Sequence, residues 1–191
     1  MKIPDAEKLV LILGGARSGK SKMAEDMALA AGGSVAYIAT APVYDDEMAH
    51  RVQLHKERRP AHWLTVEEPR DLVAALQAVP AETETVLVDC LTLWLTNLLL
   101  AGYDEDMLQE NYHDMEETIR LELSRFCAVA RERNIRTLVV ANEVGCGIVP
   151  ESHLGRLFRD IAGRANQQVA KEADALYLAV AGYPLQVKGG A

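Results

Sequence analysis

A short glycine-rich segment near the amino terminus has residue types and a spacing that suit the binding of a polyphosphate. Its residues fit the pattern G-x-x-x-x-G-K-[ST] at every fixed position: Gly14, Gly15, Ala16, Arg17, Ser18, Gly19, Lys20 and Ser21. Glycine lets the backbone curl so that several N–H groups point at one anion. Lys20 would reach the outer phosphates and stabilise developing charge, and Ser21 would hold Mg²⁺ through its hydroxyl. The segment therefore predicts a nucleoside triphosphate site with Lys20 as a catalytic residue.

The segments on either side of this loop are the ones that the motif requires. Residues 9–13 are Leu-Val-Leu-Ile-Leu, which is typical of a buried strand, and residues 22–31 are rich in Met, Ala and Leu, which predicts a helix. The positive end of that helix would add to the attraction for phosphate. A strand, a loop and a helix in this order disfavour the alternative, a chance match in a glycine-rich turn.

The second candidate is a carboxylate at the end of an apolar segment. Residues 85–89 are Thr-Val-Leu-Val-Asp, which predicts a buried strand that ends at Asp89. An aspartate at the carboxyl edge of a sheet, beside a phosphate-binding loop, suits a second Mg²⁺-directed residue. The alternative is that Asp89 caps a helix that starts near Leu91, and one aspartate can do both. The apolar strand and the phosphate loop together favour the metal role.

A compact basic cluster lies within residues 45–60 of this acidic chain. Four of its side chains are spaced so that they can share one face of a helix: Arg51, His55, Arg58 and Arg59. Arginine forms forked bonds to phosphate oxygens, and nearby cations would keep His55 neutral and nucleophilic. Imidazole attack on the α-phosphorus of a nucleotide would give a covalent intermediate. The alternative, which spacing alone favours, is an apolar stripe in which His55 packs with Met48 and Val52.

Other signals are weaker. Thr40, Ala41 and Pro42 close one predicted strand and residues 142–145 close another, and loops at such strand ends often form sites. Each is more often structural when taken alone. Glu67 is ambiguous, because Glu68 beside it could simply start the next helix. Four polar residues in the last predicted helix have two possible interpretations: they form solvated surface, or they contribute to a subunit interface or active site. They are Arg156, Arg159, Arg164 and Gln167.

Short apolar segments alternate with helical ones along the chain. Strands are predicted at residues 9–13, 35–39, 86–89, 137–141 and 175–180. The segments between them are long enough for crossover helices, so we expect an α/β fold with a mostly parallel sheet and helices on both faces. We also expect an antiparallel edge strand after the turn at Gly182, and two long helices. These three elements fall at residues 183–188, 104–133 and 154–173.

Composition narrows the class of protein. The chain has 191 residues, 49% of them hydrophobic, so we expect a single domain over residues 1–191. A formal net charge of −8 argues against a general nucleic-acid binder. The three cysteines lie far apart, which disfavours a disulfide framework or a cysteine metal cluster and favours the reducing cytosol. We expect neither a signal peptide in residues 1–8 nor a membrane span in residues 86–101.

Eight runs of residues, in one order and spanning nearly the whole chain, match those of a known family. They lie at residues 13–21, 37–41, 45–48, 51–60, 63–69, 142–145, 147–151 and 158–167. On these runs the chain resembles the bifunctional adenosylcobinamide kinase/adenosylcobinamide-phosphate guanylyltransferases of cobalamin biosynthesis. The phosphate loop is shared by very many proteins, whereas the other runs are far more specific. The acidic region at residues 104–117 resembles the family least.

The resemblance implies a phosphate-loop fold similar to that of RecA-like proteins, and two reactions. A nucleoside triphosphate phosphorylates adenosylcobinamide, and GTP then transfers GMP to that phosphate, releasing pyrophosphate and giving adenosylcobinamide-GDP. His55 matches the family's histidine that carries GMP covalently. The resemblance therefore favours a nucleophilic role for His55 over the packing role that spacing alone favours. Some relatives have a second histidine where this chain has Leu54, so a single candidate is left.

The same resemblance implies the binding residues and partners. Guanine-nucleotide contacts map to residues 14–21, Thr40, Ala41, Pro42, Lys56, Glu57, Arg58, Arg59, Glu67 and Asp89. Ser21 and Asp89 would hold Mg²⁺, with GTP and ATP as co-substrates. The implied protein is a cytoplasmic homotrimer that acts on adenosylcobinamide and adenosylcobinamide phosphate, with no nucleic-acid or membrane partner. Two rival functions are a kinase of another small molecule without guanylyl transfer, and a nucleotide-binding switch or assembly module.

Overall fold

A computed structural model describes residues 4, 6–42, 53, 59–102 and 109–189 of the chain. Within these ranges, seven strands form one sheet in the order β3-β2-β4-β5-β1-β6-β7. The strands are β1 (Leu9–Gly14), β2 (Val35–Ala39), β3 (Leu64–Glu67), β4 (Thr85–Asp89), β5 (Arg136–Asn142), β6 (Ala175–Val180) and β7 (Tyr183–Lys188). Strands β1 to β6 are parallel, and β7 pairs antiparallel with β6 at one edge.

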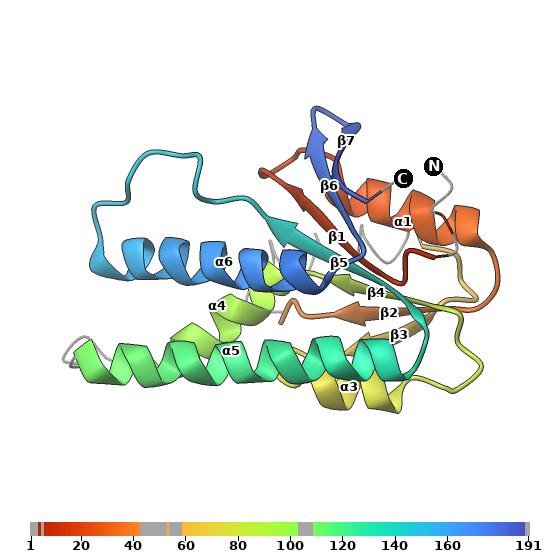
Figure 1. Ribbon diagram of the computed structural model, residues 1–191, viewed down its shortest axis with the longest axis horizontal. Helices are drawn as coiled ribbons and strands as arrows, with labels where there is room; N and C mark the ends of the chain where they lie inside the picture. Colours follow the sequence, from red (N-terminus) through yellow and green to blue (C-terminus); the bar gives the residue numbers. More distant parts are fainter. Residues whose placement is uncertain (1–3, 5, 43–52, 54–58, 103–108, 190–191) are drawn as a thin grey trace.

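Helices cover both faces of this sheet (Figure 1). The described helices are α1 (Lys20–Ala31), α3 (Leu72–Ala78), α4 (Leu91–Gly102), α5 (Gln109–Glu132) and α6 (His153–Glu172). Helix α1 shares a core with Val10 and Ile12 of β1, whereas the other four helices share a core with Leu9 and Leu11. Alternate residues of a strand point to opposite faces, so a strand buried on both faces is apolar throughout. The predicted α/β fold with a doubly covered sheet is confirmed.

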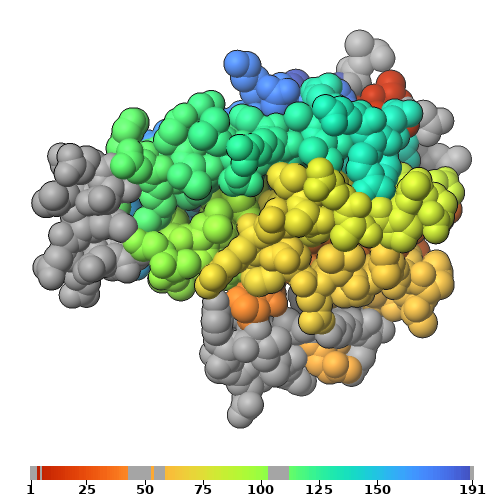
Figure 2. All heavy atoms as spheres, turned by 90° about the horizontal axis from the view of Figure 1, so that it is seen from below, coloured from red at the N-terminus to blue at the C-terminus, as the bar shows by residue number. Residues whose placement is uncertain are grey.

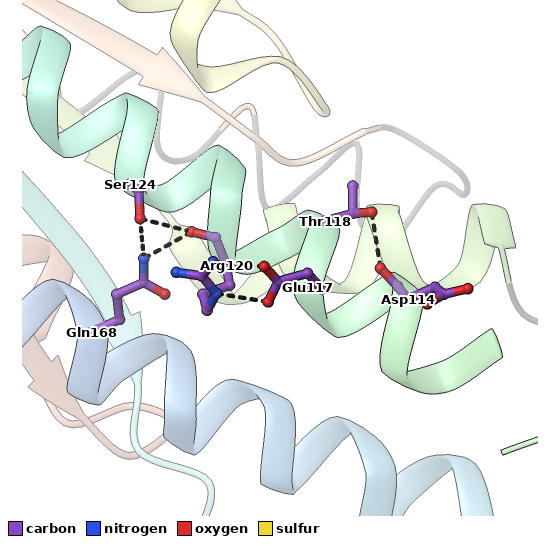
Figure 3. A network of polar contacts seen from close by, with 6 residues as sticks. All are labelled: Asp114, Glu117, Thr118, Arg120, Ser124 and Gln168. Carbon is purple, nitrogen blue, oxygen red and sulfur yellow. Dashed lines mark hydrogen bonds and ion pairs between the residues drawn. The ribbon is translucent and has the colours of Figure 1, made fainter. Parts of the chain in front are cut away.

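On the face opposite α1, the helices pack against one another as well as against the sheet. Figure 2 shows α3 and α5 side by side, and α5 also lies along α6. The Gln168 amide of α6 donates to the Arg120 carbonyl (2.8 Å) and to the Ser124 hydroxyl (2.9 Å) of α5, as Figure 3 shows. Arg164 forms an ion pair with Glu116 of α5. Arg164, one of the four polar residues whose role the sequence left open, therefore interacts with another residue of the same chain.

Most predicted elements are confirmed. Six strands, all but β3, were predicted to within one residue at each end. Helix α6 begins at His153, where the Ser152 hydroxyl accepts a bond from the Gly155 N–H and caps the first turn. Helix α5 covers residues 109–132 of the helix predicted over 104–133, and residues 104–108 lie outside the described residues. None of the described helices combines the length and apolar character needed to cross a membrane.

The register of the parallel strands brings their carboxyl ends to one edge of the sheet. Gly14 at the end of β1 pairs with Asn142 of β5. Asp89 at the end of β4 pairs with Val140 of β5 and with Ala39 at the end of β2. Ala39 in turn pairs with Glu67 at the end of β3. Candidate residues that are far apart in the sequence therefore meet along this edge, where ligands bind in open α/β sheets.

Candidate nucleotide site

The phosphate loop connects β1 to α1 at that edge and needs glycine at two positions. Gly19 precedes α1 with φ 92°, a left-handed conformation, and a Cβ there would lie 3.0 Å from the Gly182 Cα. A Cβ on Gly14 would lie 2.9 Å from the Ala179 carbonyl oxygen. Cβ atoms essentially never come as close to a backbone atom as a Cβ on Gly14 would, and at Gly19 the left-handed backbone together with a tight contact disfavours a side chain. The loop therefore lies against β6 and the turn that follows it.

Three carbonyl groups of the loop accept backbone hydrogen bonds, two of them from outside the loop. The Ser18 carbonyl accepts from the Gly182 N–H (2.8 Å) and the Gly14 carbonyl accepts from the Glu143 N–H (3.0 Å). The Gly15 carbonyl accepts from the Ser18 N–H at 3.2 Å. The first N–H groups of an α-helix have no acceptor within that helix. Carbonyls held by the protein and N–H groups at the start of α1 give the loop the polarity of an anion site.

Lys20 crosses this loop and lies close to negative charge. Its ammonium group donates to the Gly15 carbonyl at 3.1 Å. Burial lowers the pKa of Lys20 below its usual value, and the neighbouring Cys90 and Asp89 oppose that shift. Lys20 begins α1 directly after the loop and Asp89 ends β4, so the two residues lie at the same edge of the sheet on different elements. The structure therefore brings together the loop lysine and the carboxylate that the sequence singled out.

Asp89 is held by a single described side chain. The Tyr37 hydroxyl donates to Asp89 Oδ2 at 2.8 Å. Among the described residues, no hydrogen-bond donor contacts Asp89 Oδ1. Magnesium prefers oxygen ligands, and one carboxylate oxygen together with the Ser21 hydroxyl in the first turn of α1 is a chemically suitable set. Asp89 and Ser21 therefore fit the predicted role in holding Mg²⁺.

Thr40 fixes the backbone beside Asp89. Its hydroxyl donates to the Cys90 carbonyl (2.7 Å) and accepts from the Cys90 N–H (2.8 Å), and its side chain is fully buried. The Thr40 N–H donates to the Asp89 carbonyl, and the Asn97 amide donates to the Thr40 carbonyl. Every polar group of Thr40 is therefore bonded inside the protein. Ala41 and Pro42 follow it at the edge, half-buried, and their predicted nucleotide contacts stay predictions.

A basic side chain, Arg59, stacks on the ring of Tyr37 and also lines a cavity. The Arg59 guanidinium carbon lies 3.4 Å from the centroid of the Tyr37 ring. Arg59 Nε and Nη1 are buried, and neither has a hydrogen-bond partner within the described part of the chain. A cavity of about 380 Å³ is lined by Arg59, Pro60, Ala61, Trp63, Thr65 and Glu67. The predicted contacts Arg59 and Glu67 thus line one cavity.

Four predicted site residues, His55, Lys56, Glu57 and Arg58, lie outside the described residues. Tyr37, which the sequence patterns left without a role, contacts both Asp89 and Arg59. A signal was present, because Tyr37 is a tyrosine two residues before the end of a predicted strand and belongs to a run that matches the family.

Glu143, whose role was open, holds the phosphate loop through its backbone and accepts from the Gly145 N–H through its side chain.

Comparisons with known proteins agree with the resemblance. Residues 10–187 match the family model described as cobinamide kinase / cobinamide phosphate guanyltransferase. Two proteins called bifunctional adenosylcobalamin biosynthesis protein CobU match 94% of this chain and 99% of their own length. The one from Escherichia coli K12 is 44% identical and the one from Salmonella typhimurium LT2 is 45% identical. The Pseudomonas aeruginosa protein CobP is 44% identical over 94% of this chain and 96% of its own.

One solved structure supports the fold. The crystal structure of the RadB recombinase has a TM-score of 0.50 to this chain at 14% sequence identity. The match covers 90% of this chain and 74% of the recombinase. At this identity the likeness concerns the fold alone, and it supports the RecA-like phosphate-loop architecture expected from the sequence.

We predict that Thr40→Val destabilises the protein. Valine has nearly the same volume, but it leaves the buried Cys90 N–H without an acceptor, while the Cys90 carbonyl keeps only its bond from the Trp94 N–H. The free energy of unfolding should therefore fall by about 1–3 kcal/mol. Urea unfolding measures the change. The control is Thr118→Val on the exposed side of α5, where the lost bond to Asp114 should cost less than about 0.5 kcal/mol. Equal losses in the two variants would contradict the role assigned to Thr40.

We also predict that Gly19→Ala impairs nucleotide binding. A left-handed backbone at an alanine costs about 1–2 kcal/mol, and the contact with Gly182 adds to it. The affinity for GDP, measured by calorimetry, should fall at least tenfold, which is about 1.4 kcal/mol. Gly163→Ala in α6 is the matched control, since a Cβ there meets nothing within 4 Å. Unchanged GDP affinity in Gly19→Ala would show that the loop tolerates a side chain.

Proposed function

Since this chain belongs to the cobinamide kinase / cobinamide phosphate guanyltransferase family, we propose that the loop at residues 14–21 and the edge beside it carry both of the family's reactions. The chain is a bifunctional transferase of adenosylcobalamin biosynthesis. As a kinase it phosphorylates adenosylcobinamide with a nucleoside triphosphate. As a guanylyltransferase it transfers GMP from GTP to adenosylcobinamide phosphate. The observation that carries the proposal is the meeting of the phosphate loop, Lys20 and Asp89 at one edge of the sheet.

In the kinase reaction, the loop binds the triphosphate and Lys20 stabilises the transferred phosphoryl group. The N–H groups at the start of α1 point at the phosphate oxygens, and Lys20 moves from the Gly15 carbonyl to the outer phosphates. Ser21 and Asp89 would hold Mg²⁺, which would supply positive charge to the phosphate oxygens when bound. Because the loop backbone and Asp89 are held before the substrate arrives, Lys20 is the group that must turn, and little other reorganisation is needed as charge develops.

In the guanylyl transfer, His55 is the proposed nucleophile. An imidazole nitrogen attacks the α-phosphorus of GTP, a P–N bond forms, and the bond to the bridging oxygen breaks so that pyrophosphate leaves. A phosphate oxygen of adenosylcobinamide phosphate then displaces the imidazole and gives adenosylcobinamide-GDP. Dividing the transfer in this way avoids a direct displacement between two bulky anions. Support comes from Arg59, four residues after His55, whose buried donors have no partner among the described residues and suit a phosphate.

The cavity beside Arg59 is the proposed site of the guanine base. Trp63 gives it an aromatic wall, and Glu67 and Arg59 give it an acceptor and a donor. A carboxylate can accept from the two adjacent N–H groups of guanine, which adenine does not have. Glu67 therefore selects GTP for guanylyl transfer.

The remaining properties rest on the family resemblance. We propose that the enzyme is a homotrimer, acts in the cytoplasm and uses Mg²⁺ with both GTP and ATP. Its net charge of −8 supports the absence of a nucleic-acid partner.

The covalent step has a direct test. Protein incubated with GTP labelled at the α-phosphate should retain acid-labile label, and His55→Ala should retain none. His62→Ala is the control, because His62 is exposed and outside the proposed site, and it should label like the wild type. Added adenosylcobinamide phosphate should remove the label into adenosylcobinamide-GDP. An unlabelled wild type would favour a kinase without guanylyl transfer, and label on His55→Ala would assign the nucleophile elsewhere.

Base selection is tested by Glu67→Gln. Glutamine keeps the shape but replaces one acceptor oxygen by a donor, so the preference for GTP over ATP in protein labelling should fall at least tenfold. Competition between the two labelled nucleotides measures the ratio. Glu132→Gln, at the exposed end of α5, removes the same charge far from the cavity and should leave the ratio unchanged. A ratio equally unaffected in Glu67→Gln would place the base outside this cavity.

A further inference from the structure

Tyr37 contacts the proposed metal site and the proposed phosphate-binding arginine with different parts of one side chain. Its hydroxyl donates to Asp89 Oδ2 at 2.8 Å, and its ring lies 3.4 Å from the guanidinium carbon of Arg59. Tyr37 lies on β2, with Leu87 of β4 on one side and Thr65 of β3 on the other. Its hydroxyl therefore reaches toward the carboxyl edge, to a residue two positions beyond its own partner in the sheet.

Packing alone does not account for this tyrosine. The side chain is 2% exposed, and a phenylalanine would fill the same apolar space between α1 and the sheet. The added hydroxyl contacts a carboxylate rather than a backbone group. A hydrogen bond to a charged group fixes its geometry more strongly than a bond between neutral groups. The hydroxyl thus determines which oxygen of Asp89 is occupied inside the protein.

We infer that Tyr37 is a positioning residue, which holds Asp89 with Oδ1 available to the Mg²⁺–nucleotide complex and supports Arg59 above the sheet. The inference rests on the proposed role of Asp89 in holding Mg²⁺. It adds a residue to which neither the motif nor the comparisons assign a role. The two functions are coupled, because the ring and the hydroxyl that serve them move as one rigid group.

The electrostatics of the site agree with this geometry. Burial, and after it the charge of Asp89, raises the pKa of the Tyr37 hydroxyl well above its usual value, while Arg59 opposes the shift. The hydroxyl therefore keeps its proton and acts as a donor throughout the physiological pH range. Arg59, stacked on the opposite part of the side chain, gains a cation–π contact that is strongest where water is excluded.

A second buried tyrosine provides a matched control. Tyr177 is 3% exposed, belongs to the same core as Tyr37 and donates to a carboxylate oxygen of Glu7 at 3.3 Å. It differs from Tyr37 in its partner, since Glu7 precedes β1 at the opposite edge of the sheet from the phosphate loop. Removing either hydroxyl should lower the free energy of unfolding by a similar amount, but only the loss of the Tyr37 hydroxyl should weaken Mg²⁺-dependent nucleotide binding.

The experiment measures the affinity for a fluorescent GDP analogue with Mg²⁺ and with EDTA in the wild type, Tyr37→Phe, Tyr177→Phe and Asp89→Asn. We expect Mg²⁺ to strengthen binding in the wild type and in Tyr177→Phe by the same factor. In Tyr37→Phe this factor should fall three- to tenfold, with unchanged affinity in EDTA, and in Asp89→Asn it should fall further. Thermal unfolding of the two phenylalanine variants checks that their losses of stability are similar.

Three results would overturn the inference, and they differ in what else they remove. If Tyr37→Phe keeps the full Mg²⁺ factor while Asp89→Asn loses it, Asp89 retains its proposed role and Tyr37 is only a packing residue. If Asp89→Asn also keeps the full factor, the proposed metal role of Asp89 fails and the role of Tyr37 fails with it. An equal loss of the factor in Tyr37→Phe and Tyr177→Phe would also count against the inference, because it would reflect general destabilisation.

Discussion

The register of the parallel strands is the constraint on which the site depends. Gly14, Ala39, Glu67 and Asp89 are spread over 76 positions of the sequence, yet cross-strand pairing brings them to one edge of the sheet. A shift of one residue in any of these pairings would turn that strand's side chains to the opposite face. Two apolar cores oppose such a shift, because the strands are buried on both sides. Stability and the placement of catalytic groups therefore have the same origin.

Three buried side chains near this edge bond to polar groups of the protein: Tyr37, Thr40 and Asn97. Tyr37 donates to Asp89, Thr40 satisfies the backbone of Cys90, and Asn97 donates to the carbonyls of Thr40 and Pro69. An unpaired group at any of these positions would cost free energy on folding. The network thus fixes Asp89 and the backbone beside it at the same edge of the sheet as the phosphate loop.

Local patterns in the sequence predicted much of this arrangement. The loop at residues 14–21, the strand that ends at Asp89 and the hairpin at Gly182 each leave a short-range signature. Strand β3 does not, because it lies at the sheet edge with three of its four residues exposed and so lacks an apolar run. The internal bonding of Thr40 and the double contact of Tyr37 depend on partners about 20 to 50 positions away, which no local pattern reveals. The role of His55 stays a prediction.

The most direct measurement is a crystal structure of the protein with Mg²⁺ and a GTP analogue that cannot be hydrolysed. The account predicts that the phosphates lie against the N–H groups of residues 14–21, with Lys20 turned from the Gly15 carbonyl to the outer phosphates. It predicts the cation at the Ser21 hydroxyl, joined to Asp89 directly or through one water. Phosphates bound away from the loop, or a cation without contact to Asp89, would contradict it.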